Sequence, residues 1–461
     1  MVESTFTRRR VAIGLYVLVT VACLVTAAPE RYRTHTAANH FALLADAWLH
    51  GHLDLGGPPP AYTGNNDFAL YDGKHFISFP PFPALLLVPF VKLAGGADHL
   101  PDGLVFLFFA GVAPSFLFLA LEKLADLERT RRTRFENAAL AALFALGSVY
   151  WFSAIQGTVW FAAHVVGAAL ASIYLYASIG ATHPLVAGLC LGLGFATRTP
   201  LGFAFPLFLC EAWRASQGQG SASSNARVNT ANDRSTDSVD DASTRGTPAS
   251  DRAAAPSLDV RVFLERSAIF AAPAAVILGL LVWHNQARFG DPFEFGHRYL
   301  TVVWRARIEK WGLFSYHYVP RNLAVVLTSL PFTHTAGAPF QINAHGLALW
   351  FTTPLYAWAL WPRRTSATFW ALALTAAAVA LPSLAYQNSG WVQFGYRFSN
   401  DFAPFLFAMI AASARRFTFP FWLLAAWSVA VNAFGAVTFD RPAAACYYFV
   451  DGSQRILHQP D

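Results

Sequence analysis

The sequence predicts an all-α membrane protein, a polytopic helical bundle. Of its 461 residues, 55% are hydrophobic and only 13% are charged, which is more apolar surface than one soluble core buries. Aromatic residues make up 15% of the chain, as expected for helices that meet lipid and its interfaces. Apolar windows of about 20 residues, the length that crosses a bilayer, recur along the sequence. The net charge of +6 is assigned to cytoplasmic loops, so no nucleic-acid partner is expected.

The orientation follows from the basic residues. Arg8, Arg9 and Arg10 precede the first apolar window, which places the N-terminus in the cytoplasm. Residues 1–28 are therefore the cytoplasmic N-terminus and first span, and residues 29–102 form an external loop. The proline-rich apolar run 80–93 is predicted to lie along the outer interface, or to dip in and return. If it crossed, the arginines of 129–134 would be external.

The remaining windows complete about eleven transmembrane helices. They are predicted over 11–28, 103–121, 137–155, 161–179, 184–197, 200–214, 263–284, 346–361, 367–386, 401–414 and 417–437. Membrane helices thus fill 103–214, 263–284 and 346–437. Residues 215–262, rich in Ser, Asp, Arg and Ala, are predicted to be a disordered cytoplasmic insert. Residues 285–345 form a second external segment, and 438–461 an external C-terminal tail.

The first external loop is expected to carry juxtamembrane amphipathic helices. If residues 40–50 form a helix, one of its sides is apolar and the opposite side is polar. The apolar side carries Phe41, Leu44, Ala45 and Trp48. The polar side carries Asn39, Asp46 and His50. Such a helix lies on a membrane with its carboxylate and imidazole directed away from lipid. The alternative is a plain surface helix whose Asp and His are merely solvated.

A metal site is weakly indicated in the same loop. His50, His52 and Asp54 alternate in HGHLDL, and on an extended strand all three side chains would reach one metal ion. Short strings of this kind are common by chance. No metal ligand or cofactor is therefore assigned, and a divalent metal ion is left open.

Cationic residues near the outer surface are candidates for binding a phosphate. Lys74 follows an Asp-Gly turn and precedes the proline-rich run, where its ammonium suits the phosphate of a lipid carrier; ordinary snorkelling to lipid headgroups is the alternative. Arg198 and Arg397 lie at the outer ends of predicted spans, where an unpaired guanidinium is unfavourable. We expect each to have a partner, either a phosphate or a carboxylate such as Asp401 or Glu294.

His164 lies in WFAAHVV, about one turn into the outer leaflet. Its imidazole either faces the substrate or is buried in the core, where a backbone carbonyl accepts its hydrogen bond.

Several sequence segments resemble segments found in one group of enzymes. LADAWLHGHLDL and LYDGKHFISFPPFPALLLVPF, together with GLGFATRTPLGFAFP, HNQARFGDPFEFGHRYL and FGYRFSNDFAPFLF, are similar to phrases of bacterial GT-C membrane glycosyltransferases related to the dolichyl-phosphate-mannose:protein mannosyltransferase and aminoarabinose transferase group. The resemblance covers most of the chain except 215–258, and no phrase is diagnostic alone. It implies a helical bundle that takes a sugar from a polyprenyl-phosphate carrier.

One departure from that group concerns the catalytic base. These enzymes usually carry an acidic residue or pair early in the first external loop, where this chain has Ala37, Ala38 and Asn39. The nearest carboxylates are Glu30 and Asp46. Either one of these has taken over as base, or the chain belongs to a divergent branch.

The resulting hypothesis is an inverting transferase for a hexosyl or pentosyl group in the bacterial plasma membrane, with its active face extracytoplasmic. Asp46 is the expected base and Glu30 the second choice. The expected substrate-binding residues are Lys74, Arg198, Arg397, His50, His164 and Asp401. The partners are a polyprenyl-phosphate donor and membrane lipids; sugar, acceptor and oligomeric state stay open.

Two other functions remain. One is a transporter or flippase for a lipid-linked or small polar substrate, although no convincing internal repeat is present. The other is a catalytically inactive relative of the transferases that serves as a membrane partner protein.

Overall fold

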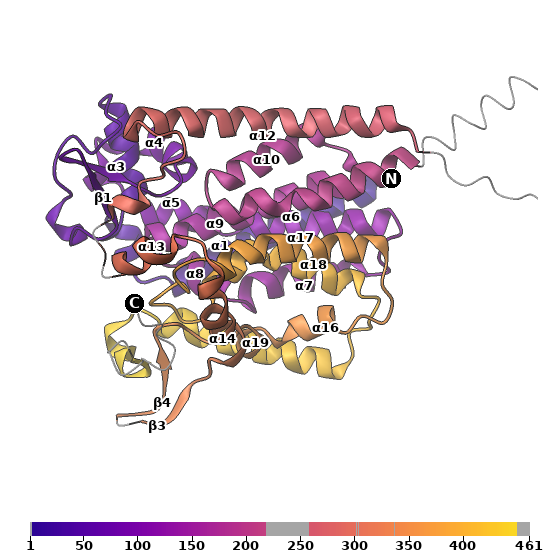
Figure 1. The fold of residues 1–461 in the computed structure, drawn as a ribbon. Helices are drawn as coiled ribbons and strands as arrows, with labels where there is room; N and C mark the ends of the chain where they lie inside the picture. The colour runs from indigo at the N-terminus through magenta and orange to yellow at the C-terminus, as the bar shows by residue number, and fades with distance from the viewer. Residues whose placement is uncertain (1, 218–257, 301, 303, 336, 450–461) are drawn as a thin grey trace, which may run out of the picture.

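The computed structural model of the chain describes residues 2–217, 258–300, 302, 304–335 and 337–449. Most of the predicted insert over 215–262, and the part of the predicted tail after residue 449, therefore lie outside the described residues. Figure 1 shows a bundle of side-by-side helices, with the two predicted external segments gathered at the end opposite the N-terminus.

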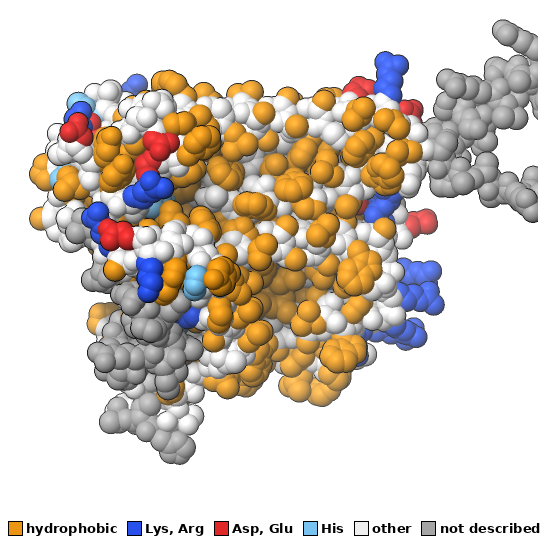
Figure 2. All heavy atoms as spheres, viewed as in Figure 1, with side chains coloured by type: hydrophobic (Ala, Val, Ile, Leu, Met, Phe, Trp, Pro, Cys, Tyr) orange, Lys and Arg blue, Asp and Glu red, His pale blue; other side chains and the backbone are white. Residues whose placement is uncertain are grey.

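Long apolar helices form the bundle. They are α1 (Val2–Thr26), α5 (Asp102–Phe109) continued by α6 (Val112–Asp126), α9 (Val159–Ser178), α12 (Val260–Phe289), α17 (Ala367–Leu384) and α19 (Phe419–Thr438). Within the described residues, six helical stretches are long and apolar enough to cross a membrane. Hydrophobic side chains cover the middle of the bundle, and charged ones gather towards its two ends (Figure 2). The chain is therefore a multi-pass membrane protein.

The other predicted spans coincide with shorter or interrupted helices. These are α7 (Arg134–Leu146) with α8 (Tyr150–Ala154), α10 (Pro184–Phe195), a helix over 205–217, α15 (Leu349–Thr352) with α16 (Ala357–Leu360), and α18 (Ala403–Ala412). Short 3-10 turns flank several of them, namely η3 (Ile179–Ala181), η4 (Thr199–Ala204), η7 (Pro354–Tyr356) and η8 (Arg397–Asp401). The total of eleven crossings stays a prediction.

The first of the two predicted external segments, which we call the first external segment, is a compact set of short elements. It contains α2 (Glu30–Arg33), α3 (His40–Leu49), η1 (Ala61–Thr63), β1 (Phe68–Tyr71), β2 (Lys74–Ile77), α4 (Phe82–Ala94) and η2 (Ala97–His99). The hairpin of β1 and β2, turned by Asp72 and Gly73 with φ of 49° and 70°, corrects the all-α expectation. Asp-Gly favours such a tight turn because both residues tolerate positive φ.

The second external segment also contains strands. It runs through η5 (His297–Tyr299), α13 (Arg305–Trp311), η6 (Tyr316–Tyr318), α14 (Val319–Thr328), β3 (Phe332–Thr335) and β4 (Ala338–Asn343). After α19, η9 (Pro442–Tyr447) leads into β5 (Tyr448–Phe449), which pairs in parallel with β4. The chain thus returns to this end of the bundle after its last long helix.

Helix α3 differs from the expected one-sided amphipathic helix. Six of its ten residues are buried, because α4 and η2 pack against it. Asn39, expected on the polar side, is 1% exposed and its amide donates to the Tyr62 hydroxyl at 3.1 Å. Asp46 and His50 do lie on the more exposed side, where His50 Nδ1 is 2.9 Å from the Asp46 carbonyl.

The HGHLDL string is not an extended strand. His50 ends α3, and Gly51 turns the chain with a φ of 78°. Among the described residues, no group of three or more His, Cys, Asp or Glu side chains is arranged to hold a metal ion.

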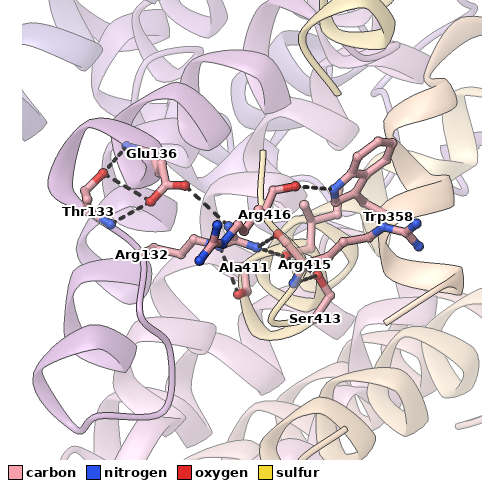
Figure 3. Close-up of polar contacts among 9 residues, drawn as sticks. Arg132, Thr133, Glu136, Trp358, Ala411, Ser413, Arg415 and Arg416 are labelled. Carbon is pink, nitrogen blue, oxygen red and sulfur yellow. Dashed lines mark hydrogen bonds and ion pairs between the residues drawn. The ribbon is translucent and has the colours of Figure 1, made fainter. Parts of the chain in front are cut away.

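At the end of the bundle opposite the external segments, Arg132 connects two helices. Arg132 donates from Nη2 to the carbonyls of Ile410 and Arg415 at 3.2 and 2.6 Å, and from Nε to Ala411 at 3.2 Å (Figure 3). The carbonyls of Ile410 and Ala411 belong to the last turn of α18 and that of Arg415 to the segment after it; carbonyls at a helix end lack partners within the helix, so a cation there satisfies them. Its ion pair with Glu136, in the first turn of α7, joins α7 to α18.

A close backbone approach fixes the start of the first external segment on the bundle. The Asp102 carboxylate accepts from the Thr36 N–H and hydroxyl at 2.7 and 2.9 Å. A Cβ on Gly103 would lie 1.9 Å from the Arg31 carbonyl oxygen. Only glycine fits between α5 and α2 at this separation.

We therefore expect Gly103→Ala to push residues 31–36 away from α5 and to break the Thr36–Asp102 hydrogen bonds. The unfolding temperature should fall, and protease should cut the first external segment faster than in the wild type. Gly279→Ala is the matched control, since a Cβ there has no atom within 4 Å and alanine favours a helix. Equal stability of the two variants would contradict the close approach.

Candidate functional site

A cluster of charged side chains lies at the outer end of the bundle, where segments far apart in the sequence meet. We call it the outer cluster; it consists of His40, Asp67, Trp160, His164, Arg198, Tyr386, Arg397 and Asp401. The first external segment, α9, the loop after α10, the end of α17 and η8 supply its members.

Asp67 comes from a tight loop before β1. Gly64, Asn65 and Asp67 have φ values of 60°, 53° and 61°, and positive φ is uncommon for residues other than glycine. The Asp67 carboxylate accepts from Trp160 Nε1 at 2.7 Å. Burial raises the pKa of Asp67, while the Trp160 bond and the charges of His40 and Arg397 oppose the rise. The loop thus holds a carboxylate of increased basicity against α9.

His40 supports this loop from the first turn of α3. Its Nε2 lies 2.8 Å from the Asn66 carbonyl oxygen, and its ring stacks on Phe68 with 4.4 Å between centroids. The Nε2 donates to that carbonyl, so Nδ1 carries the lone pair, and Nδ1 has no partner among the described residues. Burial lowers the pKa of His40, while the Asn66 carbonyl and the Asp67 carboxylate oppose the change.

A buried ion pair lies deeper in the cluster. Arg198 donates to Asp401 from Nε at 3.1 Å and from Nη2 at 2.8 Å. His164 Nδ1 lies 3.1 Å from Oδ1 of the same carboxylate. Asp401 and His164 are fully buried. Because a buried carboxylate needs such partners, this network fixes the direction of the Arg198 side chain.

Arg397 is the unbalanced charge of the cluster. It is 7% exposed, and Nη1 donates to the carbonyls of Gly390, Trp391 and Val392 at 2.8, 3.3 and 3.3 Å. Within the described residues it forms no ion pair, and its Nε has no hydrogen-bond partner. A buried guanidinium without a carboxylate is unfavourable, so an anionic ligand would complete this site.

Aromatic rings hold both guanidiniums in place. The Arg397 guanidinium is 4.9 Å from the Phe161 ring centroid and 5.6 Å from that of Phe398. The Arg198 guanidinium is 5.0 Å from the same Phe398 ring. Two guanidiniums on one ring are geometrically close, and the attraction to its face stabilises each. The Phe398 ring thus contacts both cations of the cluster.

Asp67 belongs to the more exposed part of the cluster. Asp67, Arg198 and Tyr386 are half-buried, whereas Arg397, Asp401 and His164 are buried. Tyr386, directly after α17, is within electrostatic reach of both Asp67 and Arg397. A ligand would thus meet the carboxylate, the phenol and Arg198 first, with Arg397 behind them.

The structure brings together part of the predicted site. Arg198, His164 and Asp401 contact one another, and Arg397 shares Phe398 with them. Asp401 is the partner that the sequence suggested for an arginine. Glu294, the other suggestion, instead accepts from the Gly296 N–H at 2.7 Å and lies 3.5 Å from Arg298.

The other predicted residues lie elsewhere on the first external segment. Asp46 and His50 form their own pair at 3.6 Å, and the Lys74 side chain is 62% exposed and 3.7 Å from Asp54. Glu30 is exposed at the start of α2. No contact joins these side chains to the outer cluster among the described residues, and their predicted roles remain predictions.

Sequence reasoning did not select Asp67, His40 or Tyr386. The available signal was GNNDF, a run of turn-forming residues directly before the first strand. Such a run holds a side chain more rigidly than an open loop, but only the contact with Trp160 separates Asp67 from its neighbours.

Comparison with known proteins gives a distant structural likeness. No protein-family model and no curated protein matches the chain. The solved structure of the archaeal oligosaccharyltransferase AglB from Archaeoglobus fulgidus, in complex with an inhibitory peptide and a dolichol-phosphate, has 13% identity and a TM-score of 0.44 over 92% of this chain and 56% of that chain.

Two further structures of the Archaeoglobus fulgidus oligosaccharyltransferase are similar to this chain to about the same degree. The apo form has 13% identity and a TM-score of 0.41 over 95% of this chain and 56% of that one. The form tethered to an acceptor peptide with the NVT sequon has 12% identity and a TM-score of 0.42 over 95% and 55%. The chain thus spans little more than half the length of these proteins, and a likeness this distant leaves its function open.

Proposed function

We propose that the chain is a membrane glycosyltransferase that takes a sugar from a polyprenyl-phosphate donor and transfers it to an acceptor on the extracytoplasmic side. The observation that carries the proposal is Arg397, a buried guanidinium without an ion-pair partner in the described structure, within electrostatic reach of the half-buried carboxylate of Asp67. An anion site next to a base is what transfer from a phosphate carrier requires.

The phosphate of the donor would bind between the two arginines. A guanidinium presents several N–H donors in one plane and matches phosphate oxygens. Arg198 is held by Asp401, so it keeps its direction when the ligand is absent. As the bond to the sugar breaks, negative charge grows on the phosphate oxygen, and Arg397 stabilises that charge because it has no carboxylate of its own.

Asp67 would act as the base. It takes the proton of the acceptor hydroxyl as that oxygen attacks the anomeric carbon, while the bonding electrons between this carbon and the phosphate oxygen leave with the phosphate. Burial raises the pKa of Asp67, which makes the carboxylate a stronger base than an exposed one. Attack opposite the leaving phosphate inverts the anomeric configuration.

The transferred group, the membrane, the orientation of the chain and the alternative site residues are proposals as well. The transferred group is a hexosyl or pentosyl unit, the location is the bacterial plasma membrane, and the N-terminus is cytoplasmic. Asp46 and Glu30 remain alternatives to Asp67 as the base. Lys74 remains an alternative contact for the phosphate, at a greater exposure than either arginine.

Native mass spectrometry of the protein in nanodiscs tests the proposal. A polyprenyl phosphate should bind saturably, and the matching polyprenol, which lacks the phosphate, should bind far more weakly. Lys74→Ala should change the affinity little, since an exposed cation is screened by solvent. Equal binding of phosphate and alcohol would refute the proposal, and transport of a polar solute by proteoliposomes would favour a transporter.

A further inference from the structure

A cavity of about 500 Å³ opens at the outer end of the bundle, separate from the outer cluster. We call it the Glu30 cavity. The first external segment contributes Glu30 and Arg31, the end of β4 contributes 342–344, the loop before η8 contributes 392–393, and the segment after α19 contributes 439–448. Its volume lies in the range of small-molecule sites.

We infer that the Glu30 cavity binds a neutral saccharide and that this is the acceptor subsite. The role as acceptor subsite rests on the proposed function, whereas saccharide binding itself does not. The inference follows from the chemistry of the lining, from the backbone around the cavity and from its distance to Arg397.

The polar lining suits a ligand with many hydroxyl groups. It consists of carboxylates, guanidiniums and amides, from Glu30, Asp440, Arg31, Arg441, Asn343 and Gln393. A sugar hydroxyl both donates and accepts, so it pairs with groups of either kind. Two carboxylates and two guanidiniums leave no net charge, which disfavours a strongly anionic or cationic ligand.

Part of this polar lining is already fixed in place. Arg31 and Asp440 form an ion pair, and Arg441 Nη2 donates to the Thr26 carbonyl at 2.6 Å. The Glu30 carboxylate has no hydrogen bond among the described residues, so it is free to accept from a ligand. Phe439 and Tyr448 also line the cavity and supply aromatic surface for the C–H face of a sugar ring.

The backbone around the cavity is strained. Val392 and Asp440 both line it and have φ values of 56°. Positive φ is a genuine outlier for a β-branched residue such as valine. Strain of this kind persists where the surrounding structure enforces it, and it clusters at ligand sites.

Two of the residues that line the Glu30 cavity also form hydrogen bonds with Arg397. Val392 lines the cavity, and its carbonyl accepts from Arg397 Nη1 at 3.3 Å. Gln393 also lines it, and its Oε1 accepts from the Arg397 N–H at 3.0 Å. A saccharide that fills the cavity therefore ends next to the loop that holds Arg397, as an acceptor must.

Filling the cavity tests the inference with the full chain in nanodiscs. Ala445 lines the cavity and is exposed, so Ala445→Trp occupies the space without removing a side-chain hydrogen bond. Ala443→Trp is the matched control, because Ala443 is exposed on the same η9 turn but does not line the cavity. The probes are an array of neutral, acidic and amino oligosaccharides together with peptides.

We expect the wild type to bind neutral oligosaccharides, Ala445→Trp to bind them at least about tenfold more weakly, and Ala443→Trp to match the wild type. Binding that Ala445→Trp leaves unchanged, a preference for charged glycans or peptides, or no binding of any neutral oligosaccharide by the wild type would each overturn the inference.

Donor binding, measured with polyprenyl phosphate in the same samples, separates this inference from the proposed function. If the lipid phosphate binds but neutral saccharides do not, the cavity assignment fails and the transferase proposal stands. If saccharides bind and Ala445→Trp prevents it, while the lipid phosphate does not bind, the cavity is a saccharide site and the transferase proposal fails.

Discussion

Asp67→Asn should lower the rate of sugar transfer by about 10²–10⁴-fold, the usual contribution of a general base. Asparagine keeps the size of the side chain, tolerates positive φ and still accepts from Trp160 through its carbonyl oxygen. The expected loss is therefore in kcat, with binding of polyprenyl phosphate and the unfolding temperature near their wild-type values. A transfer assay with a radiolabelled lipid-linked donor measures the rate.

The pH profile gives a second readout of the same change. The base works as the carboxylate, and burial raises the pKa of Asp67, so kcat/KM should fall as the pH falls through this raised pKa. In the Asp67→Asn variant, this decrease of kcat/KM at low pH should disappear. Asp72→Asn, an exposed turn residue with a φ of 49°, is the matched control and should keep both rate and profile.

The same assay decides between Asp67 and the other carboxylates. Asp46→Asn should retain most of the transfer rate if Asp67 is the base, and Glu30→Gln should retain kcat while KM for the acceptor rises, because Glu30 lines the Glu30 cavity. A large loss in either variant, together with normal transfer by Asp67→Asn, would return the role to the residue that the sequence indicated.

Arg397→Gln should weaken polyprenyl-phosphate binding and reduce kcat/KM by about 10²–10³-fold, the effect of removing one preorganised donor from developing negative charge. Glutamine still donates to the carbonyls of residues 390–392, but it removes the positive charge. Titration of the lipid phosphate by native mass spectrometry gives the affinity, and the transfer assay gives kcat/KM.

Two variants make the Arg397 result specific. Arg397→Lys keeps the charge but lacks the planar set of donors, so it should restore only part of the affinity. Arg298→Gln removes a side chain that is 77% exposed and should leave binding unchanged. If Arg397→Gln bound the lipid phosphate as tightly as the wild type, the anion site would lie elsewhere.

The sequence was sufficient to find residues that stand out against an apolar background. Arg198, Arg397, His164 and Asp401 lie within or beside predicted spans, where a charge is costly and its presence calls for a partner. Three of them do contact one another, and Asp401 is a partner named in advance. The location of the membrane helices followed from hydropathy for the same reason.

The first external segment was less predictable, because polar residues are ordinary there. Its carboxylates are equivalent by sequence, and the amphipathic pattern of 40–50 placed Asn39 on the wrong side. Helix α4 and η2 pack against α3, and such tertiary packing overrides a local hydrophobic pattern.

The sequence by itself determined a multi-pass helical membrane protein and the arginines that need a counter-charge, since hydropathy and charge act locally along the chain. Only the tertiary structure brought Asp67 within electrostatic reach of Arg397. Asp67 meets Trp160 across 93 positions of sequence, and Arg397 lies farther still along the chain. Their shared burial strengthens the electrostatic interaction between them, and burial is a property of the assembled end of the bundle that no short stretch of sequence carries.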